Sequence, residues 1–550
     1  MICLGVPMRQ LFVSLIVVLG LAAGGAHGQV PQPLQNLRPA SGLSSNTVQS
    51  LAAAGDSLWI GPLLTVYVGE NGREGGDPLF AAQGPAVEQR LLNGDNIVLS
   101  LAARGGAPGR AAVWAGLAFG TGEGTAGAGG FLVSTDGGES FVGRPAPLDE
   151  PSDTTIRYGA STLPAVPVTQ ESGSPPRDVA LGGKDTVWVA SDRAGLRRST
   201  DRGDTWARVV LPPDTSARIE PAQTYDFLVA APQDDGRGFR NHRALSVLVD
   251  ETGTVWAGTV AGLNRSTPAD VGPGGDRAWR LFRPDGTPGL LTGQIVLALA
   301  EQPRPDGRNP VWAATLRANT DGPLQRSGLT VTPDGGDTFR QALIGEQVND
   351  VAARQTRVYA AAESGLFVSG DQGRTWRTVE TVALDEDDEV LPGGLTARAV
   401  EVTPAALWVG TTEGLLRLDR AQEPRLLPEN ADAPPPQWQL FRTEVPVSPE
   451  TPTEQVPDVK TYAYPNPFVP SRDGVVRIVY DVPQSQTVEV NIYDFGMNRV
   501  RTLRDDEPAG RQEMVWDGTD ASGLRLPTGP YLYTVEMAGE TVRGKILLSN

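Results

Sequence analysis

The stretch Val255-Trp256-Ala257-Gly258 decides the fold, because close variants of it return through most of the chain. Each copy has a β-branched residue or Leu, then an aromatic, an apolar and a small residue. The seven copies are Leu58-Trp59-Ile60-Gly61, Val113-Trp114-Ala115-Gly116, Val187-Trp188-Val189-Ala190, Val255-Trp256-Ala257-Gly258, Val311-Trp312-Ala313-Ala314, Val358-Tyr359-Ala360-Ala361 and Leu407-Trp408-Val409-Gly410. The copies start 47 to 74 residues apart. Recurrence at such intervals is typical of a protein built from repeated structural units.

Other short apolar segments accompany these copies in a constant order. Before most copies lies another strand pattern, at 48–52, 98–102, 245–249, 296–300 and 400–402. After several lies a Gly-Leu strand start, at 195–199, 262–266, 365–369 and 414–418. A segment led by an aromatic follows, with Trp206, Trp279, Phe339, Trp376 and Trp438. Four strands in this order make one propeller blade. The pattern therefore predicts an all-β fold with a seven-bladed β-propeller over residues 29–444, whereas a β-helix has shorter and more regular rungs.

Composition agrees with short strands and excludes several classes of protein. The 550 residues exceed the size at which one hydrophobic core stops growing, so we expect more than one domain. The 65 Gly and 46 Pro favour many turns, while 39% apolar residues and 11 Trp supply cores. The net charge is −18 and no basic stripe occurs, so we expect no binding to nucleic acid.

The first 28 residues have the features of a secretory signal peptide. Arg9 precedes the apolar run 11–23, and Ala26-His27-Gly28 offers small residues for cleavage between Gly28 and Gln29. Thirteen apolar residues are too few to span a bilayer, so we expect no transmembrane segment in the mature chain. The single cysteine, Cys3, lies inside this segment, so the mature chain has no thiol for a disulfide, a nucleophile or a metal site.

Four blades share a turn motif between their third and fourth strands. It occurs as Ser134-Thr135-Asp136-Gly137-Gly138-Glu139-Ser140-Phe141, Ser199-Thr200-Asp201-Arg202-Gly203-Asp204-Thr205-Trp206, Thr332-Pro333-Asp334-Gly335-Gly336-Asp337-Thr338-Phe339 and Ser369-Gly370-Asp371-Gln372-Gly373-Arg374-Thr375-Trp376. We expect the carboxylate to accept backbone N–H groups and the second glycine to adopt a positive φ. The motif resembles the Asp-box, or BNR repeat, which implies a structural role for Asp136, Asp201, Asp334 and Asp371.

Other blades resemble a second repeat family. The segments 41–48 with 58–61, 253–259 and 407–415 are similar to the periplasmic propeller repeats of two-component regulators. Those sensors continue into a membrane helix and a kinase, and neither pattern follows here. The resemblance therefore extends to the blades and does not imply signalling.

Beyond residue 444 the pattern changes twice. Residues 445–460 are rich in Pro, Thr and acidic residues and predict a linker. Residues 461–550 contain alternating strands at 475–480, 488–493, 500–503, 511–516, 531–537 and 543–548, which predict a small Ig-like β-sandwich. This module resembles the type A sorting domain of the type IX secretion system, a relative of the FlgD-type Ig-like fold. The resemblance rests on Tyr464, Pro465, Asn466, Pro467, Phe468, Trp516, Gly529, Tyr531 and Lys545, among others.

The sorting-domain resemblance implies export through the periplasm and across the outer membrane, with the type IX machinery as partner. We therefore expect a secreted or cell-surface protein. An ordinary Ig-like domain without a sorting role is the alternative.

No catalytic constellation stands out, so we predict no catalytic, cofactor or metal residues. A sialidase needs a Tyr–Glu nucleophile pair, and the propeller tyrosines are few: Tyr67, Tyr158, Tyr225 and Tyr359. At most one histidine, His242, remains after cleavage, which excludes a histidine-based metal cluster. We expect a monomeric binding or scaffold propeller that holds a glycan or a surface protein at its mouth. A carbohydrate-active enzyme, sialidase-like or endoglucanase-like, is the second possibility.

Overall fold

The structure is a computed structural model, and its chain divides into two compact units, Met1–Glu444 and Val445–Asn550. It describes residues 47–549 with internal gaps. The gaps are 62–63, 69–78, 83–96, 106–110, 122–125, 139, 184, 273–274, 285–288, 308, 319–324, 380–381, 385–389, 392–394, 413, 431–432, 442–459, 465, 467, 469, 471–474 and 508. The predicted signal peptide with its cleavage pair Gly28 and Gln29, and the predicted linker 445–460 except Lys460, lie outside the described residues.

In its described part, the first unit contains seven antiparallel sheets, each built around four strands that follow one another in the chain. Sheets 1 and 2 contain β1 (Leu51–Ala54), β2 (Ser57–Ile60), β3 (Thr65–Val68) and β4 (Leu79–Ala82), then β5 (Ile97–Arg104), β6 (Ala112–Gly120), β7 (Ala126–Ser134) and β8 (Val142–Arg144). Sheets 3 and 4 contain β11 (Pro176–Leu181), β12 (Val187–Ser191), β13 (Gly195–Ser199) and β14 (Ala207–Arg208), then β16 (Ala244–Val249), β17 (Val255–Thr259), β18 (Gly262–Ser266) and β19 (Trp279–Phe282).

The remaining sheets follow the same plan. Sheets 5 and 6 contain β20 (Ile295–Glu301), β21 (Val311–Leu316), β22 (Gly328–Thr332) and β23 (Arg340–Ala342), then β24 (Val348–Arg354), β25 (Arg357–Ala362), β26 (Gly365–Ser369) and β27 (Arg377–Val379). Sheet 7 contains β30 (Ala397–Val402), β31 (Ala406–Thr411), β32 (Leu415–Asp419) and β33 (Gln437–Phe441). All seven copies of the tryptophan motif, including Tyr359, lie on the second strand of a sheet, as predicted.

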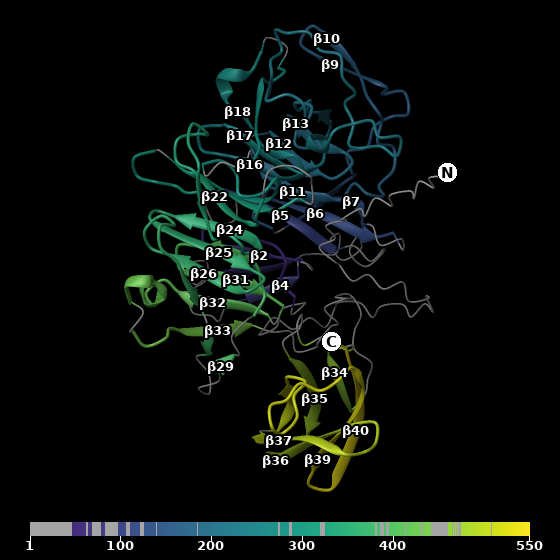
Figure 1. The fold of residues 1–550 in the computed structure, drawn as a ribbon, viewed down its shortest axis with the longest axis vertical. Coiled ribbons are helices and arrows are strands. Elements are labelled where there is room, and N and C mark those ends of the chain that lie inside the picture. Colours follow the sequence, from purple (N-terminus) through teal and green to yellow (C-terminus); the bar gives the residue numbers. More distant parts are fainter. Residues whose placement is uncertain are drawn as a thin grey trace, which may run out of the picture. The chain divides into compact units, whose positions relative to one another are not determined.

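The first strands of these sheets form a closed ring (Figure 1, purple through teal to green). Strand β1 contacts β5, and the contacts continue through β11, β16, β20 and β24 to β30, which contacts β1 again. At the seam, the Val48 N–H donates to the Thr411 carbonyl at 2.9 Å. Sheets arranged radially around a central axis define a β-propeller. The all-β prediction is thus confirmed.

Small residues on the second strands make room for contacts between neighbouring sheets. A Cβ atom on Gly116 would lie 2.4 Å from the Ser100 Oγ, and one on Gly258 would lie 2.2 Å from the Ser246 Oγ. Ser100 donates to the Pro176 carbonyl of sheet 3 at 2.8 Å, and Ser246 donates to Val296 of sheet 5 at 3.2 Å. Glycine is therefore required where an inner-strand hydroxyl reaches the next sheet.

Insertions add strands to sheets 4 and 7 and form a separate two-stranded sheet before sheet 3. The segments before and after sheet 3 meet where Ala165 pairs with Val229, and the first of them carries β9 (Thr155–Tyr158) and β10 (Ser161–Pro164). Strand β15 (Arg218–Ile219) pairs with β19, and β28 (Val382–Leu384), itself paired with β29 (Val390–Leu391), joins β33 in parallel. The short 3-10 helices are η3 (Arg240–His242), η4 (Pro268–Asp270), η5 (Glu423–Leu426) and η6 (Pro428–Asn430).

The second unit is a sandwich of two antiparallel sheets (Figure 1, yellow). One contains β34 (Thr461–Tyr464), β35 (Val476–Val482) and β38 (Gly510–Trp516); the other contains β37 (Arg499–Glu507), β36 (Gln486–Tyr493), β39 (Gly529–Met537) and β40 (Glu540–Leu548). Their inner faces bury one apolar cluster that includes Phe468, Trp516 and Tyr533. Alternation of buried and exposed residues along β39 explains why this segment forms a strand with one covered face.

Candidate functional site

The four turns predicted to be Asp boxes share one hydrogen-bond pattern. In the turn of sheet 3, the Thr205 backbone N–H donates to the Asp201 Oδ1 at 2.9 Å, and the Thr205 hydroxyl donates to Oδ2 at 2.5 Å. The Ser199 hydroxyl donates to Asp201 and accepts the Gly203 N–H. The same bonds occur around Asp136, Asp334 and Asp371. Each carboxylate is therefore used inside its own turn.

Each turn also packs against the preceding sheet. Gly203 has φ 81° and lies so close to Trp114 of sheet 2 that an added Cβ would be 2.6 Å from its ring. Gly373 has φ 74°, and an added Cβ there would be 2.3 Å from the ring of Trp312 in sheet 5. Edge-to-face aromatic pairs accompany these contacts: Trp114 with Trp206 at 6.3 Å, and Trp312 with Trp376 at 6.2 Å. The turns thus fasten one sheet to the next.

Hydrogen bonding lowers the pKa of these carboxyls. The Ser140 hydroxyl lowers the pKa of Asp136 to about 2, and the Thr205 hydroxyl and N–H do the same for Asp201. For Asp371, partial desolvation opposes the shift, but the Thr375 N–H and hydroxyl still bring the pKa to about 2. A carboxyl held ionised in this way lacks the raised pKa of a general acid.

Two further aspartates, Asp178 and Asp350, lie on the first strands of sheets 3 and 6. Each follows a β-bulge and bonds across to the next sheet: Val247 donates to Asp178 at 2.8 Å, and Val400 donates to Asp350 at 2.9 Å. Desolvation, with a smaller contribution from the charge of Asp350, raises the pKa of Asp178 to about 7. Desolvation also raises the pKa of Asp350, to about 6. Sequence reasoning missed both residues.

Most residues of the predicted sorting motif that the structure describes gather at one edge of the second unit. Asn466 donates to the Lys545 carbonyl at 2.9 Å, and Phe468 is fully buried, with its N–H on the Leu547 carbonyl at 2.8 Å. Trp516 contacts both Phe468 and Tyr531. The Tyr464 hydroxyl donates to Glu513, Gly529 pairs with Leu548 on β40, and Lys545 is exposed. Pro465 and Pro467 lie outside the described residues.

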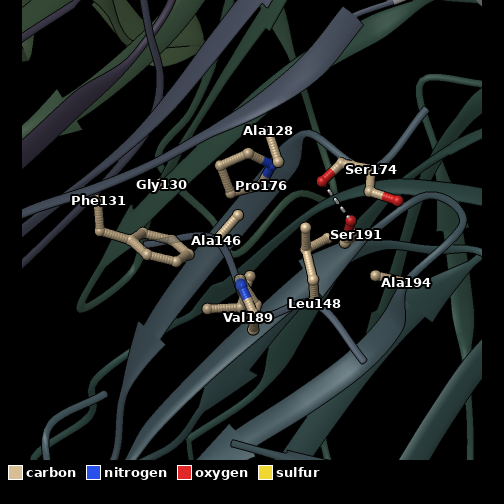
Figure 2. Close-up of a pocket in the computed structure, with 11 residues that line it drawn as sticks. Ala128, Gly130, Phe131, Ala146, Leu148, Ser174, Pro176, Val189, Ser191 and Ala194 are labelled. Atoms are coloured by element: carbon tan, nitrogen blue, oxygen red, sulfur yellow. Dashed lines mark hydrogen bonds between the residues drawn. The ribbon is translucent and has the colours of Figure 1, made fainter. Parts of the chain in front are cut away.

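Two hollows in the first unit differ greatly in size. One lies between sheets 2 and 3, holds about 10 Å³, and is lined by apolar groups such as Phe131, Leu148 and Val189. Figure 2 shows the Ser191 hydroxyl donating to the Ser174 carbonyl at its wall. That volume admits no more than one water molecule. The other, of about 460 Å³, is open and lies between sheets 5 and 6 beside Arg340, Arg374 and Trp376.

Two further properties concern only the residues that the structure describes. No helix in these ranges is long and apolar enough to cross a membrane. Within the same ranges, no three or more His, Cys, Asp and Glu side chains gather where they could hold a metal ion.

Part of the second unit matches a known domain family. Residues 473–541 match the FlgD Ig-like domain family. This range covers most of the sandwich, from just before β35 to the start of β40. No curated protein matches the chain.

Solved structures with partial likeness include PorZ, a surface component of the type IX secretion system of Porphyromonas gingivalis. It is 13% identical, covers 92% of this chain and 82% of its own, and has a TM-score of 0.31. YCF48 bound to a D1 peptide is 16% identical over 69% of this chain and 95% of its own, with a TM-score of 0.37. FlgD from P. aeruginosa is 28% identical over 13% and 59%, with a TM-score of 0.12. At these scores the likenesses establish neither a common fold nor a common role.

Proposed function

We propose that this chain is a secreted or cell-surface β-propeller that works by binding or as a scaffold, without catalysis, and is exported through the type IX secretion system. Its propeller has seven blades, one for each sheet, over residues 29–444. A signal peptide (1–28) precedes it, and a linker (445–460) joins it to a sorting domain (461–550). The combination of a closed ring of sheets with a FlgD Ig-like domain supports this proposal most strongly.

Residues of the sorting motif share one structural role, which is to connect the start of the domain to its last strand. Asn466 and Phe468 fasten the segment before β35 to β40, next to the exposed Lys545. A surface built from both ends of a domain exists only after the domain has folded. Recognition of this edge by the type IX machinery would thus select a completed chain. The propeller acts as a monomer and binds a glycan or a surface protein at its mouth.

Deletion of residues 462–550 tests the export route. In a type IX-competent host, we expect the truncated chain to fold and remain in the periplasm while the full chain reaches the surface or the medium. A matched control replaces residues 462–550 by an unrelated Ig-like domain of the same size. Retention of both altered chains supports a sorting role, while export of either contradicts it.

A glycoside hydrolase is the second candidate, and one observation favours it. The carboxyls of Asp178 and Asp350 combine a raised pKa with a position on the first strands β11 and β24, and a catalytic acid also needs a raised pKa. Each, however, accepts two backbone N–H bonds, from Val247 and Val179 or from Val400 and Val351. Release of reducing ends from a panel of polysaccharides, abolished by Asp178→Asn, would replace our proposal with this one.

A further inference from the structure

The larger hollow lies along an uncovered sheet edge. Strand β23 is the outermost strand of sheet 5 and pairs only with β22 among the described strands. The hollow runs along residues 340–344 and faces Gly373, Arg374 and Trp376 in the Asp-box turn of sheet 6. Ile344 is 49% exposed there. An outermost strand offers unpaired N–H and C=O groups to another strand.

Among the other described outer strands of sheets 2 to 7, β19 and β33 pair with a further strand, while β8, β14 and β27 make side-chain contacts with neighbouring segments. Strand β19 pairs with β15, and β33 pairs with β28. On β14, Arg208 donates to the Val166 carbonyl of the insertion at 3.0 Å. On β27, Arg377 donates to the Arg425 carbonyl of η5 at 2.9 Å, and on β8, Arg144 forms an ion pair with Asp204. Sheet 5 thus lacks the added strand that covers the outer strand in sheets 4 and 7.

The two added strands show how such an edge is covered in this molecule. In sheet 4, Ile219 of β15 lies opposite Trp279, and in sheet 7, Leu384 of β28 lies opposite Trp438. Ile219 is fully buried and Leu384 is 7% exposed. Each added strand therefore places an aliphatic side chain against the aromatic residue of the outer strand. In sheet 5 the equivalent aromatic is Phe339, directly before β23.

The motif residue beside the open edge carries the opposite charge to its counterparts in the other three turns. The sixth residue of the motif is acidic in three of them, Glu139, Asp204 and Asp337, and in the fourth it is Arg374. Asp204 pairs with Arg144 of the preceding sheet, whereas Arg374 faces Arg340. The structure gives the Arg374 guanidinium no hydrogen bond or ion pair with any described residue. The nearby carboxylate of Asp371 is occupied by its own turn.

Like charges accumulate at this junction in a chain of net charge −18. Desolvation lowers the pKa of Arg340, and the neighbouring Arg374 lowers it further. The same two causes lower the pKa of Arg304, which donates to Gln372 at 2.8 Å. Arg340 is held over the Trp312 ring and donates to the Gly373 carbonyl, so it cannot move away. The charge of Asp371 opposes the pKa shift at Arg340, and that of Asp306 opposes the shift at Arg304. Because the structure gives neither Arg340 nor Arg374 an ion pair with a described residue, the hollow favours an acidic ligand.

We propose that the hollow between β23 and the Asp-box turn of sheet 6 binds an extended acidic segment of another protein, which adds a strand to β23. Its backbone pairs with the open edge, as β15 and β28 pair with theirs. An aliphatic side chain of the segment packs against the exposed Ile344, and its carboxylates meet Arg340 and Arg374. This inference goes beyond the proposed function and does not depend on the export route.

Binding of a labelled peptide to the purified chain tests the proposal. The probe is fluorescein-Val-Asp-Val-Asp-Val-Asp, followed by fluorescence anisotropy; the controls are the same peptide with Lys for Asp, and with N-methylated backbone. We expect saturable, salt-sensitive binding of the acidic probe only. Arg374→Glu should weaken it by about tenfold or more, because the contact changes from attraction to repulsion. Arg202→Glu, on the Asp-box turn of sheet 3, is the matched control and should change it less than about twofold.

Hydrogen exchange identifies the edge directly in the unaltered chain. The acidic probe should slow the exchange of amides in residues 340–344 and leave those of β27 unchanged. Absence of binding, equal loss in both Arg variants, or equal binding of the N-methylated probe would each overturn the proposal. So would stronger binding of an oligogalacturonate, because that result assigns the hollow to an acidic glycan.

Discussion

Two sets of aspartates accept backbone N–H groups in the first unit: a rim set inside turns of single sheets and a hub set between neighbouring sheets. The rim set comprises the predicted Asp-box residues Asp136, Asp201, Asp334 and Asp371; the hub set comprises Asp178 and Asp350 on the inner strands. Both sets accept backbone N–H groups at similar distances, 2.9 Å for Thr205 onto Asp201 and 2.8 Å for Val247 onto Asp178. Their surroundings shift the pKa values in opposite directions, to about 2 at Asp201 and to about 7 at Asp178.

The rim and hub carboxylates accept the same kind of hydrogen bond, yet their contributions to folding stability depend on pH in opposite ways. A rim carboxyl with a lowered pKa stabilises the fold above the unfolded value of 3.8, and this contribution is lost as the pH falls through about 2. A hub carboxyl with a raised pKa favours the folded state at low pH. That contribution disappears as the pH rises from about 4 to about 7. Burial, and not the bond itself, decides the sign.

The largest effect should come from the aromatic residue behind a rim turn. Trp312 is fully buried and contacts both Gly373 and Trp376. Trp312→Ala should lower the free energy of unfolding by about 3–5 kcal/mol, because it leaves a cavity between sheets 5 and 6. Trp376→Ala, at a partly exposed ring, should cost about 1–2 kcal/mol. Equal losses in chemical denaturation would show that the turn does not depend on the buried ring.

The next effect should come from the glycine that lets the rim turn approach that ring. Gly373→Ala should cost about 2–4 kcal/mol, since it combines an unfavourable positive φ with overlap against Trp312. Gly307 is the matched control: its φ is 69°, and nothing lies within 4 Å of an added Cβ. Gly307→Ala should cost only about 1 kcal/mol. Melting temperatures that fall equally would mean that φ alone, and not the contact between sheets, sets the requirement for glycine.

At the hub, Asp178→Asn should change the pH dependence more than the stability itself. Asparagine keeps an oxygen for Val247 but cannot ionise, so the variant should lose less stability than wild type between about pH 4 and pH 7. The Asp350 carboxyl remains and should preserve part of the slope. Melting temperature against pH measures the difference. A variant with the wild-type slope would refute the assignment of this titration to Asp178.

The smallest effect should come from the rim carboxylates. Asp371→Ala should cost about 1 kcal/mol near neutral pH, because the exposed turn loses bonds that water partly replaces. Asp371→Asn should cost less, since the amide oxygen still accepts the Thr375 N–H. The difference between alanine and wild type should shrink as the pH falls toward about 2, where the wild-type carboxyl becomes protonated. A difference that grows in acid would invert the proposed sign.

The sequence predicted those features that repeat along the chain. The tryptophan motif located the second strand of each sheet in the first unit. An aromatic residue followed by small residues packs in the same way on that strand in every sheet. The aromatic-led segments were found for a related reason: Trp279 and Trp438 lie in outer strands, while Trp206 and Trp376 directly precede theirs. In the second unit, alternating apolar residues identified the strands that match the FlgD Ig-like domain.

Features that depend on one position in one sheet could not be predicted. Asp178 and Asp350 become hub residues only because a bulge turns them toward the next sheet, and no residue type marks that bulge in the sequence. The charge reversal at Arg374 gains meaning only when the two sheets that meet there are known. One local signal did exist, since an arginine replaces an acidic residue at the sixth position of the motif.

The seam of the ring has a mechanical consequence. Every described sheet of the first unit uses strands that are consecutive in the chain, so β1 and β30 meet without sharing a sheet. A pulling force applied at the two ends of the propeller would therefore load the Val48–Thr411 bond and its side-chain contacts before any sheet has to unravel. The molecule would open as a clasp does, in one step, and then lengthen sheet by sheet.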